Sequence, residues 1–508
     1  MRELLVEKNC YFDSVFLLRI SREIEGLAGV EKAVVAMGTP ANLESLERVG
    51  FAFDRSATRA LPTDLVIAVE AASAGALERA RARLAELLVG RQSAERKAIA
   101  KPTTLSEAVD IDPRINLVLI SVPGAYAARE ARRALRRGLH VFLFSDNVSV
   151  EDEIALKDEA KARGLLLMGP DCGTAILNGI PIGFANVVRR GPIGLIGASG
   201  TGIQEITSLI DRLGSGVSQA IGTGGRDLSE SVAARSTLAG IDALADDPET
   251  AVLAVVSKAP SAAVADRVLD RLRRAGKPTI VQFVASAPRA SEHGITFAAT
   301  LDEAARLACR KAGLDVPAQA HPPEIPHLAF HSRQRFVRGL FCGGTLCQEA
   351  WSILRTAGLE VRSNVAADER LYLGAGEKAA GHLLWDLGDD AFTVGRPHPM
   401  IEPDLRDRHV AAAGADPSVA VVLVDCVIGY GSHPDPAGSL ARAAEKAHAA
   451  ARGEKRPLVV VSSVTGTARD PQNYEAQRHT LQAAGILVAE TNALAAQCAA
   501  AIVQGGSR

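Results

Sequence analysis

Ten short apolar runs constrain the fold more strongly than any other feature of this chain. They are nearly continuous in Val, Ile and Leu, without regular polar alternation, which is typical of strands buried on both faces of a parallel sheet. Amphipathic stretches of helical periodicity separate most of them, and this order indicates the α/β class. The runs are residues 65–71, 115–122, 140–145, 164–169, 193–198, 251–257, 279–284, 338–344, 419–425 and 458–463.

Composition excludes several classes of protein. The 508 residues are 47% hydrophobic with a formal net charge of -2, which favours several soluble globular domains and gives no electrostatic footprint for nucleic acid. No run of eighteen apolar residues predicts a membrane span, and the charged start lacks the apolar core of a signal peptide, so we expect a cytoplasmic protein. Seven scattered cysteines without a CxxC pair indicate neither disulfides nor a metal site.

The runs and the polar stretches between them predict four domains. Periodicity in the first part indicates a small α+β domain of ferredoxin-like type, and three doubly wound Rossmann-like or flavodoxin-like domains follow. Polar residues 91–104 and the proline-containing residues 318–334 are predicted linkers. The predicted domains are residues 1–95, 104–190, 191–318 and 335–508.

Two strand-to-helix turns share one pattern. In GLIGASGTGIQEI a strand ends at Ile196 and a helix begins near Gly200, and RGLFCGGTLCQEAWSIL at 338–354 repeats the arrangement with its own Gln-Glu pair. Small residues let backbone N–H groups approach an anion, and the helix dipole adds positive potential. Either turn alone could be an ordinary helix cap, but together they predict one phosphate held from two sides. The predicted phosphate-binding residues are Ser199, Gly200, Thr201, Gly202, Gly343, Gly344 and Thr345.

Longer motifs, in order, resemble the FdrA family, single-chain relatives of succinyl-CoA synthetase. The motifs that carry this resemblance are SDNVSVEDE (145–153), MGPDCGTAI (168–176), IGTGGRDLSESV (221–232), HLLWDLGDDAFTVGRPHPMI (382–401) and DCVIGYGSHPDPA (425–437). The resemblance implies that residues 104–190 are similar to the CoA-binding domain of the synthetase alpha subunit. It also implies an alpha-type ligase domain in 191–318 and a beta-type ligase domain in 335–508. Within these motifs we expect Asn147, Asp171, Gly224 and Gly225 to bind substrate.

The chain departs from the synthetases where they relay phosphate. Their phosphohistidine lies in a GHAGA-like loop, whereas this chain has SAPRASEHGITFAATLDEAA, in which His293 lacks the motif and is expected at the surface. Their supporting glutamate is replaced by Lys258, a cation suited to a leaving phosphate. Residues 1–95 are also too few for an ATP-grasp domain.

The resemblance and the lost histidine favour carbamoyl transfer between carbamoyl phosphate and a small carboxylic amide such as oxamate. The family link implies partner subunits of the same allantoin-degrading pathway, hence a hetero-oligomer that binds small molecules, with no nucleic acid or membrane partner. No cofactor is certain: carbamoyl phosphate or phosphate is the expected substrate, and CoA binding stays open. The alternatives are an acyl-CoA synthetase subunit of succinate-CoA ligase type and a noncatalytic subunit that binds CoA or a metabolite.

Two further segments offer candidate residues. Residues 386–401 form a stretch of little periodicity in which Arg396 could hold an acceptor carboxylate in a bidentate fork, or could pair with a neighbouring aspartate. Asp425 and His433 follow the strand at 419–425, near the sheet edge where α/β sites usually lie. Asp425 is a predicted substrate contact and His433 a predicted acid or base, although a loop histidine satisfied by its neighbours is the alternative. The predicted catalytic residues are therefore Lys258, Arg396 and His433.

Overall fold

The computed structural model describes most of the chain, which splits into two compact units, Met1–Ile111 and Asp112–Arg508. The described residues are 1–8, 10, 12, 14–51, 60–95, 102–286, 289–320, 323–325, 328–366, 368–374, 377, 380–393 and 396–505. Parts of both predicted linkers and of the loop that carries His293 lie outside them, namely residues 96–101, 287, 288, 321, 322, 326 and 327.

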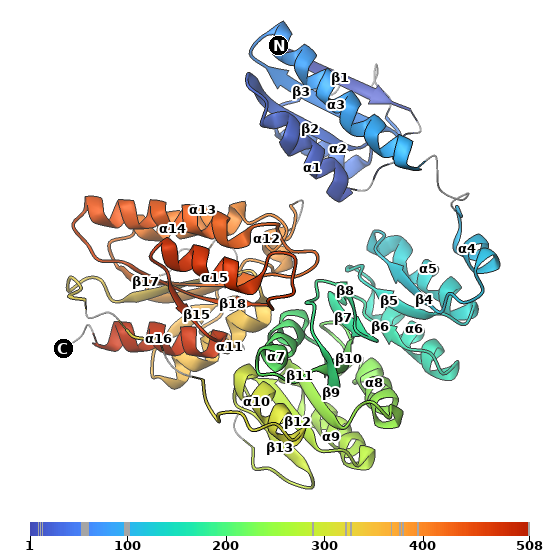
Figure 1. The fold of residues 1–508 in the computed structure, drawn as a ribbon, viewed down its shortest axis with the longest axis vertical. Helices are drawn as coiled ribbons and strands as arrows, with labels where there is room; N and C mark the ends of the chain where they lie inside the picture. Colours follow the sequence, from blue (N-terminus) through green and yellow to red (C-terminus); the bar gives the residue numbers. More distant parts are fainter. Residues whose placement is uncertain are drawn as a thin grey trace. The chain divides into compact units, whose positions relative to one another are not determined.

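The first unit is a small α+β domain (Figure 1). Strand β3 lies between β1 and β2 and is antiparallel to both, which is the order of a ferredoxin-like sheet. Alternate residues of β3 face opposite sides, so that Leu65 and Ile67 pack with α1 and α3, whereas Val66 and Ala68 pack with α2. The elements are β1 (Arg2–Glu7), α1 (Ser14–Glu25), β2 (Val30–Met37), α2 (Pro40–Arg48), β3 (Leu65–Ala71), α3 (Ala74–Glu95) and α4 (Leu105–Ile111).

The second unit begins with a small parallel sheet in the order β4-β5-β6. Helix α5 buries a face of alanines against it, because Ala127, Ala131 and Ala134 recur at helical spacing. The elements are β4 (Leu117–Ile120), α5 (Gly124–Arg136), β5 (His140–Leu143), α6 (Val150–Ala162) and β6 (Leu167–Met168).

A seven-stranded sheet follows, in the order β13-β12-β11-β9-β10-β7-β8. Its core strands β9, β10, β11 and β12 are parallel, and the hairpin β7-β8 joins the edge of β10 through an antiparallel contact between Ile176 and Ala220. The hairpin extends this sheet across the boundary predicted near residue 190, because its hydrogen bonds go to β10. The elements are β7 (Thr174–Leu177), β8 (Ile180–Gly183), β9 (Arg190–Gly197), α7 (Gly200–Arg212), β10 (Val217–Gly222), α8 (Arg235–Asp246), β11 (Val252–Lys258), α9 (Ala262–Ala275), β12 (Thr279–Val284), β13 (Ile295–Phe297) and α10 (Leu301–Lys311).

The last sheet is parallel throughout, in the order β15-β16-β14-β17-β18-β19. Every residue of β17 is buried: Val421 and Leu423 pack on the side of α11 and α16, and Val422 and Val424 on the side of α13 and α14. The elements are β14 (Phe336–Phe341), α11 (Gly344–Thr356), β15 (Val361–Ser363), β16 (His382–Asp386), α12 (Asp390–Thr393), α13 (Asp404–Ala415), β17 (Val419–Val427), α14 (Pro436–Gly453), β18 (Val459–Thr465), α15 (Tyr474–Ala483), β19 (Leu487–Ala489) and α16 (Asn492–Gly505).

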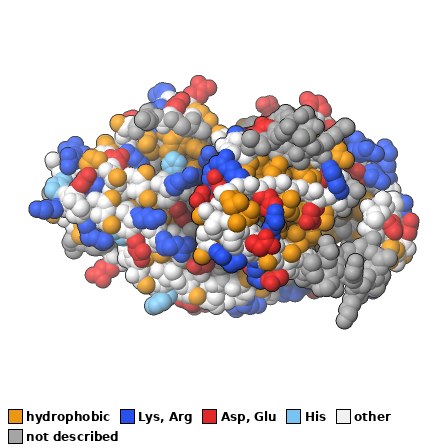
Figure 2. Space-filling view, turned by 90° about the horizontal axis from the view of Figure 1, so that it is seen from above, with side chains coloured by type: hydrophobic (Ala, Val, Ile, Leu, Met, Phe, Trp, Pro, Cys, Tyr) orange, Lys and Arg blue, Asp and Glu red, His pale blue; other side chains and the backbone are white. Residues whose placement is uncertain are grey.

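The architecture confirms the predicted α/β fold class with its small α+β N-terminal domain. All ten predicted runs contain a strand, and the runs at 251–257, 279–284 and 419–425 are buried along almost their whole length. One hydrophobic core joins helices α7 and α10 of the seven-stranded sheet to α11 and α16 of the last sheet. On the face seen in Figure 2, acidic and basic side chains lie interspersed with hydrophobic ones. Within the described ranges, no helix combines the length and apolarity needed to span a bilayer.

Candidate functional site

The two glycine turns meet. Ser199 caps α7, where its Oγ accepts the Gly202 N–H at 3.0 Å, and the same Oγ lies 2.5 Å from Oγ1 of Thr345 on α11. The backbone of Gly343 is packed against Thr201, because a Cβ at residue 343 would lie 2.9 Å from Thr201 Cγ2. The N-termini of α7 and α11 are therefore neighbours.

Both helix starts have unused hydrogen-bond donors. In the part of the chain that the structure describes, no acceptor pairs with the backbone N–H groups of Gly200, Thr201, Gly344, Thr345 and Leu346. Each helix has thirteen residues, long enough for its dipole to add positive potential at this end. This combination of donors and positive potential is suited to an anion such as phosphate.

Two buried glutamates hold the helices in this arrangement. Glu205 on α7 accepts from the Thr465 hydroxyl and from the backbone N–H of Asn492, which begins α16. Glu349, at the matching position of α11, accepts from the N–H of Leu301 at 2.7 Å, which begins α10, and from Asn492 Nδ2 at 2.8 Å. Burial raises the pKa of both carboxyls, that of Glu349 to about 7. Each glutamate thus fastens its helix to a helix start in the other half of the site.

Asp425 orients the second turn. Its side chain is fully buried, and its carboxylate accepts the backbone N–H groups of Cys342 and Gly343, each at 2.8 Å. The buried guanidinium of Arg406 donates to the Asp425 carbonyl at 3.2 Å and lies 3.6 Å from Cys342 Sγ. Both carboxylate oxygens are thus engaged by the turn and the side chain is fully buried, so Asp425 braces the turn, and its role as a substrate contact stays a prediction.

Asp386 is a site residue that the sequence prediction left out of the site. It ends β16, is 8% exposed, and lies against the start of α11, where a Cβ at Gly344 would collide with its Oδ2. Its Oδ1 accepts the Gly388 N–H at 2.9 Å. Burial raises the pKa of this carboxyl to about 7, although the Gly388 N–H and the charge of Lys258 act in the opposite direction. Near neutral pH, Asp386 can therefore accept or give a proton beside the anion-binding turns.

His398 lies in the same corner. A Cβ at Gly388 would be only 2.5 Å from His398 Nε2 and 2.7 Å from the Cys342 carbonyl oxygen, so glycine allows this close approach. The ring packs 6.0 Å from Phe184, and its Nδ1 accepts the Met400 N–H at 3.2 Å. Burial lowers the pKa of His398 to about 4, and the imidazole is neutral at physiological pH.

Lys258 ends β11 and is exposed. Its carbonyl accepts from the Ser257 hydroxyl, but its ammonium has no hydrogen bond or ion pair among the described residues. The charge of this ammonium lowers the pKa of both Asp386 and Asp171, so it lies within electrostatic range of both. Desolvation by the surrounding protein raises the pKa of the Asp171 carboxyl to about 6, although part of the side chain is exposed to solvent. The negative charges of Asp390 and Asp146 act in the same direction.

The predicted glycine loop contacts the Asp171 loop. Gly224, with φ of 86°, is pressed against the Pro170 carbonyl, and a Cβ at Gly225 would lie 3.1 Å from Asp171 Oδ2. A buried ion-paired cluster fixes the same loop, because Lys157 Nζ lies 2.7 Å from Asp227 Oδ1 and 3.2 Å from the Thr223 carbonyl oxygen. The two loops that carry the predicted substrate-binding residues Asp171, Gly224 and Gly225 are thus in contact, and their role in binding substrate stays a prediction.

Three predicted residues have other surroundings. Arg396 is exposed, and its backbone N–H donates to Thr393. The Nδ1 of His433 accepts the Asp435 N–H at 3.0 Å, beside the start of α14, which matches the alternative of a satisfied loop histidine. Asn147 is exposed in the loop after β5, with φ of 53°. None of these three residues has a hydrogen bond to the paired turns among the described residues. Their catalytic and binding roles stay predictions.

Two further observations bear on the predicted chemistry. The side chain of His293 is 74% exposed and lies near Glu292, which confirms the expectation of a surface loop residue. Within the described residues, no group of three or more His, Cys, Asp and Glu side chains could hold a metal ion.

Family models match three stretches of the chain. A model described as CoA-ligase matches residues 340–502, and one described as CoA binding domain matches residues 188–285. A third, described as AllF, heavy metal-associated domain, matches residues 1–103. The CoA-binding match covers β9 to β12, whereas the sequence analysis placed the CoA-binding-like domain at 104–190.

Curated relatives and solved structures give the wider setting. The chain is 42% identical to the uncharacterized protein YahF of Escherichia coli over 498 residues, 96% of each chain. It is 29% identical over 175 residues to the alpha subunit of succinate–CoA ligase [ADP-forming] from Aquifex aeolicus, covering 33% of this chain and 56% of that one. A dinucleotide forming acetyl-coenzyme A synthetase 1 from Ca. Korarchaeum cryptofilum, solved with phosphate and ADP, aligns with a TM-score of 0.35 at 15% identity over 81% of this chain and 86% of that one. The match to YahF places the chain in the YahF family, and the CoA-binding and CoA-ligase matches show that this chain has domains similar to those of succinyl-CoA synthetases.

Proposed function

We propose that the chain is the subunit of an acyl-CoA synthetase-like enzyme that handles an acyl phosphate, and that the acyl group passes directly between phosphate and an acceptor. The observation that carries this proposal is the pairing of the α7 and α11 N-termini through Ser199 and Thr345, with five backbone N–H groups left without partners among the described residues. Two helix starts, with free N–H groups and the positive ends of their dipoles, together form an anion-binding site that suits a phosphate.

The chemistry follows from the groups around the turns. When an acceptor attacks the acyl carbon, the bond to the phosphate oxygen breaks and negative charge develops on the leaving phosphate. The free N–H groups and Lys258 stabilise that charge. Asp386 accepts the proton that the acceptor loses, a role suited to a carboxyl with a pKa of about 7. The reverse reaction uses the same groups, with Asp386 as the acid.

The surroundings of His293 argue against a phosphohistidine step. The corresponding loop of the synthetases carries the phosphate-accepting histidine, whereas His293 is largely exposed beside Glu292. Lys258 stands where those enzymes place a glutamate. The proposed subunit therefore depends on a partner for any nucleotide-driven step.

Two acceptors fit different observations. The CoA-ligase and CoA-binding matches favour the thiol of CoA as the acceptor. The carboxylates of Asp146, Asp171 and Asp390 lie close enough to affect one another, and they oppose a polyanion in their midst. They favour the second candidate, carbamoyl transfer between carbamoyl phosphate and a small amide such as oxamate, in a hetero-oligomer of one pathway.

An acceptor-exchange assay tests the proposal. The full-length protein, alone and with candidate partner subunits, is given succinyl phosphate with CoA, or carbamoyl phosphate with oxamate, and phosphate release is followed. CoA-dependent release supports the acyl-CoA reaction, and oxamate-dependent release supports carbamoyl transfer. Phosphate that binds without either turnover, in every subunit combination, would refute the enzymatic proposal in favour of a metabolite-binding subunit.

A further inference from the structure

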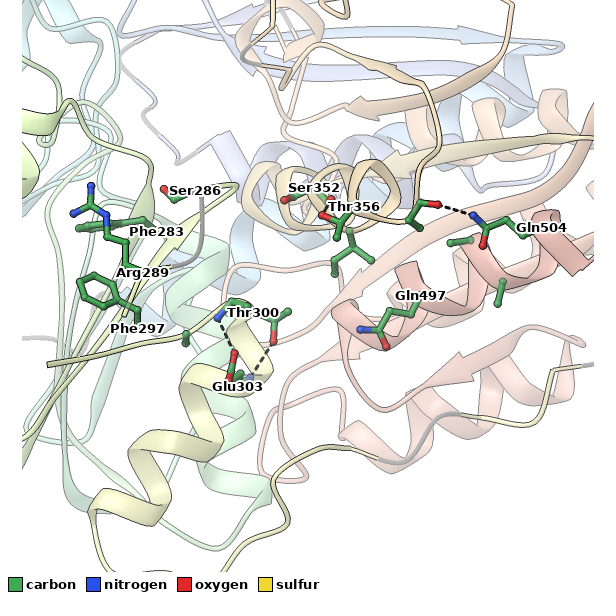
Figure 3. Close-up of a pocket in the computed structure, with 16 residues that line it drawn as sticks. Phe283, Ser286, Arg289, Phe297, Thr300, Glu303, Ser352, Thr356, Gln497 and Gln504 are labelled. Carbon is green, nitrogen blue, oxygen red and sulfur yellow. Dashed lines mark hydrogen bonds between the residues drawn. The ribbon is translucent and has the colours of Figure 1, made fainter. Parts of the chain in front are cut away.

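A cavity of about 670 Å³ lies between the ends of α11 and α16, the start of α10 and the loop after β12 (Figure 3). Its volume is typical of small-molecule sites. The α11 residues that line it begin at Ser352, eight positions beyond Gly344, so the cavity starts about 12 Å along the helix from the paired turns at 1.5 Å per residue. It is therefore separate from the proposed phosphate site.

An internal two-fold relation explains why this space is hollow. Helices α7 and α11 match in sequence from Gly200 and Gly344 onward, with Gln-Glu at the same positions, so that Arg212 corresponds to Thr356. Arg212 fills its own half: it donates to the carbonyls of Val464, Gly466 and Glu490, and its guanidinium lies 4.4 Å from the centre of the Tyr474 ring.

The half that contains the cavity has no side chain equivalent to Arg212 or Tyr474 among the described residues. Thr356 is short, and its hydroxyl donates to the Ser352 carbonyl within its own helix at 2.9 Å. Tyr474 begins α15, which connects β18 to β19, whereas the described residues between β12 and β13 contain no helix. The groove that Arg212 and Tyr474 occupy in one half is left open in the other.

The lining of the cavity combines apolar side chains with polar ones and includes two charged residues, Arg289 and Glu303. Phe283, Phe297 and Ile353 line its sides, and the guanidinium of Arg289 lies 5.9 Å from the centre of the Phe297 ring. Glu303 already accepts the N–H of the preceding loop residue, Ala299, at 2.7 Å. Among the described lining residues, Arg289 is thus the charged side chain without a hydrogen bond or ion pair.

We propose that this cavity binds an amphipathic monocarboxylate. The carboxylate pairs with Arg289, since a guanidinium fork matches a carboxylate in geometry and charge. The apolar body lies between Phe283, Phe297 and the ends of α11 and α16. A single guanidinium suits a single carboxylate, and the negative charge of Glu303 in the same lining disfavours a phosphorylated ligand of higher charge. The site adds an effector or second-substrate position to the interface between the two ligase-like halves.

Calorimetric titration of the full-length protein tests this, with octanoate as the probe and octanamide as its neutral counterpart, in saturating phosphate so that the paired turns are filled. We expect octanoate to bind at least tenfold more tightly than octanamide. Arg289→Gln should weaken octanoate binding tenfold or more, to the level of the amide. Thr356→Phe, which places a ring in the cavity beside α11 without adding charge, should weaken the binding of both probes.

Both altered positions are exposed, so the variants should fold, which circular dichroism checks. Arg274→Gln, which removes an exposed arginine from α9, is the matched control and should bind octanoate like the unaltered protein. The proposal is overturned if octanoate does not bind, if octanamide binds equally well, or if Arg289→Gln or Thr356→Phe leaves octanoate binding unchanged. Octanoate binding is measured without turnover, whereas the proposed function is tested by phosphate release, so the two proposals fail separately.

Discussion

Replacing Asp386 with asparagine should stabilise the protein at alkaline pH and remove its activity. The carboxyl is 8% exposed beside the start of α11, and its pKa is raised from 3.8 to about 7, first by burial. The unfolded chain ionises this group freely, whereas the folded chain resists ionisation. Asparagine has nearly the same shape, keeps an oxygen to accept the Gly388 N–H, and cannot ionise.

The sign and size follow from proton linkage. Because the folded pKa is the higher one, the stabilisation that the protonated Asp386 carboxyl contributes is fully present below pH 4 and is lost as pH rises to about 7. A shift of about three units at 1.36 kcal/mol each gives about 4 kcal/mol. One changed hydrogen bond at the helix start offsets roughly 1 kcal/mol of this. Asp386→Asn should therefore raise the free energy of unfolding by about 2 to 4 kcal/mol above pH 7 and by close to zero at pH 4.

Urea unfolding between pH 4 and pH 8.5, in phosphate-free buffer, measures this difference. The two tryptophans of the chain, Trp351 and Trp385, both lie in the half that contains Asp386, so their fluorescence reports its unfolding. Glu360→Gln is the control, because it removes an exposed carboxylate from the same half of the chain and should shift stability equally little at every pH. Parallel pH–stability curves for Asp386→Asn and the unaltered protein would refute the reasoning, as would turnover that stays within threefold of the unaltered rate.

Three other expectations concern the paired turns. Lys258→Ala should lower turnover on the order of a hundredfold with folding intact, because the leaving phosphate loses a charge-assisted contact; steady-state kinetics with the required partners measure it. Gly344→Ala should abolish the thermal stabilisation that phosphate gives, since a Cβ there collides with a buried carboxylate, whereas Gly200→Ala, whose nearest neighbour atom would lie at 3.2 Å, should keep most of it. Incubation with nucleoside triphosphate or acyl phosphate should leave no acid-labile phosphate on His293, which phosphopeptide mapping can detect.

Each of these three predictions has a control or an outcome that would contradict it. Lys311→Ala removes an exposed lysine at the end of α10 and should leave kinetics unchanged. Lys258→Ala with unaltered kinetics would leave the helix starts as the sole phosphate grip, and equal loss of phosphate protection in both glycine variants would show that the steric argument fails. Phosphate found on His293 would restore a relay of the synthetase type.

The amino-acid sequence by itself determined the strands and the chemistry of the turns. Parallel strands buried on both faces must be apolar at nearly every position, so β11, β12 and β17 could be found from their continuous apolar runs alone. The small residues at 199–202 and 343–345 could be recognised for a similarly local reason, because a backbone that approaches an anion tolerates few side chains. Edge strands such as β15 and β19, three residues each, have too few residues for a pattern to form.

Only the tertiary structure decided which residues complete the site. Asp386 reaches the start of α11 because β16 pairs with β14. His398 packs against Gly388 because the irregular segment between them folds back on itself. The pairing of β14 with β17 brings the Asp425 carboxylate to the backbone N–H groups of Cys342 and Gly343, where it braces the turn. The cavity beside Arg289 depends on Thr356 standing where the other half has Arg212, a difference that acquires meaning once the two helices are packed side by side. Strand order and side-chain direction depend on contacts between segments that are far apart in the sequence. A local sequence pattern does not specify which segments will pair.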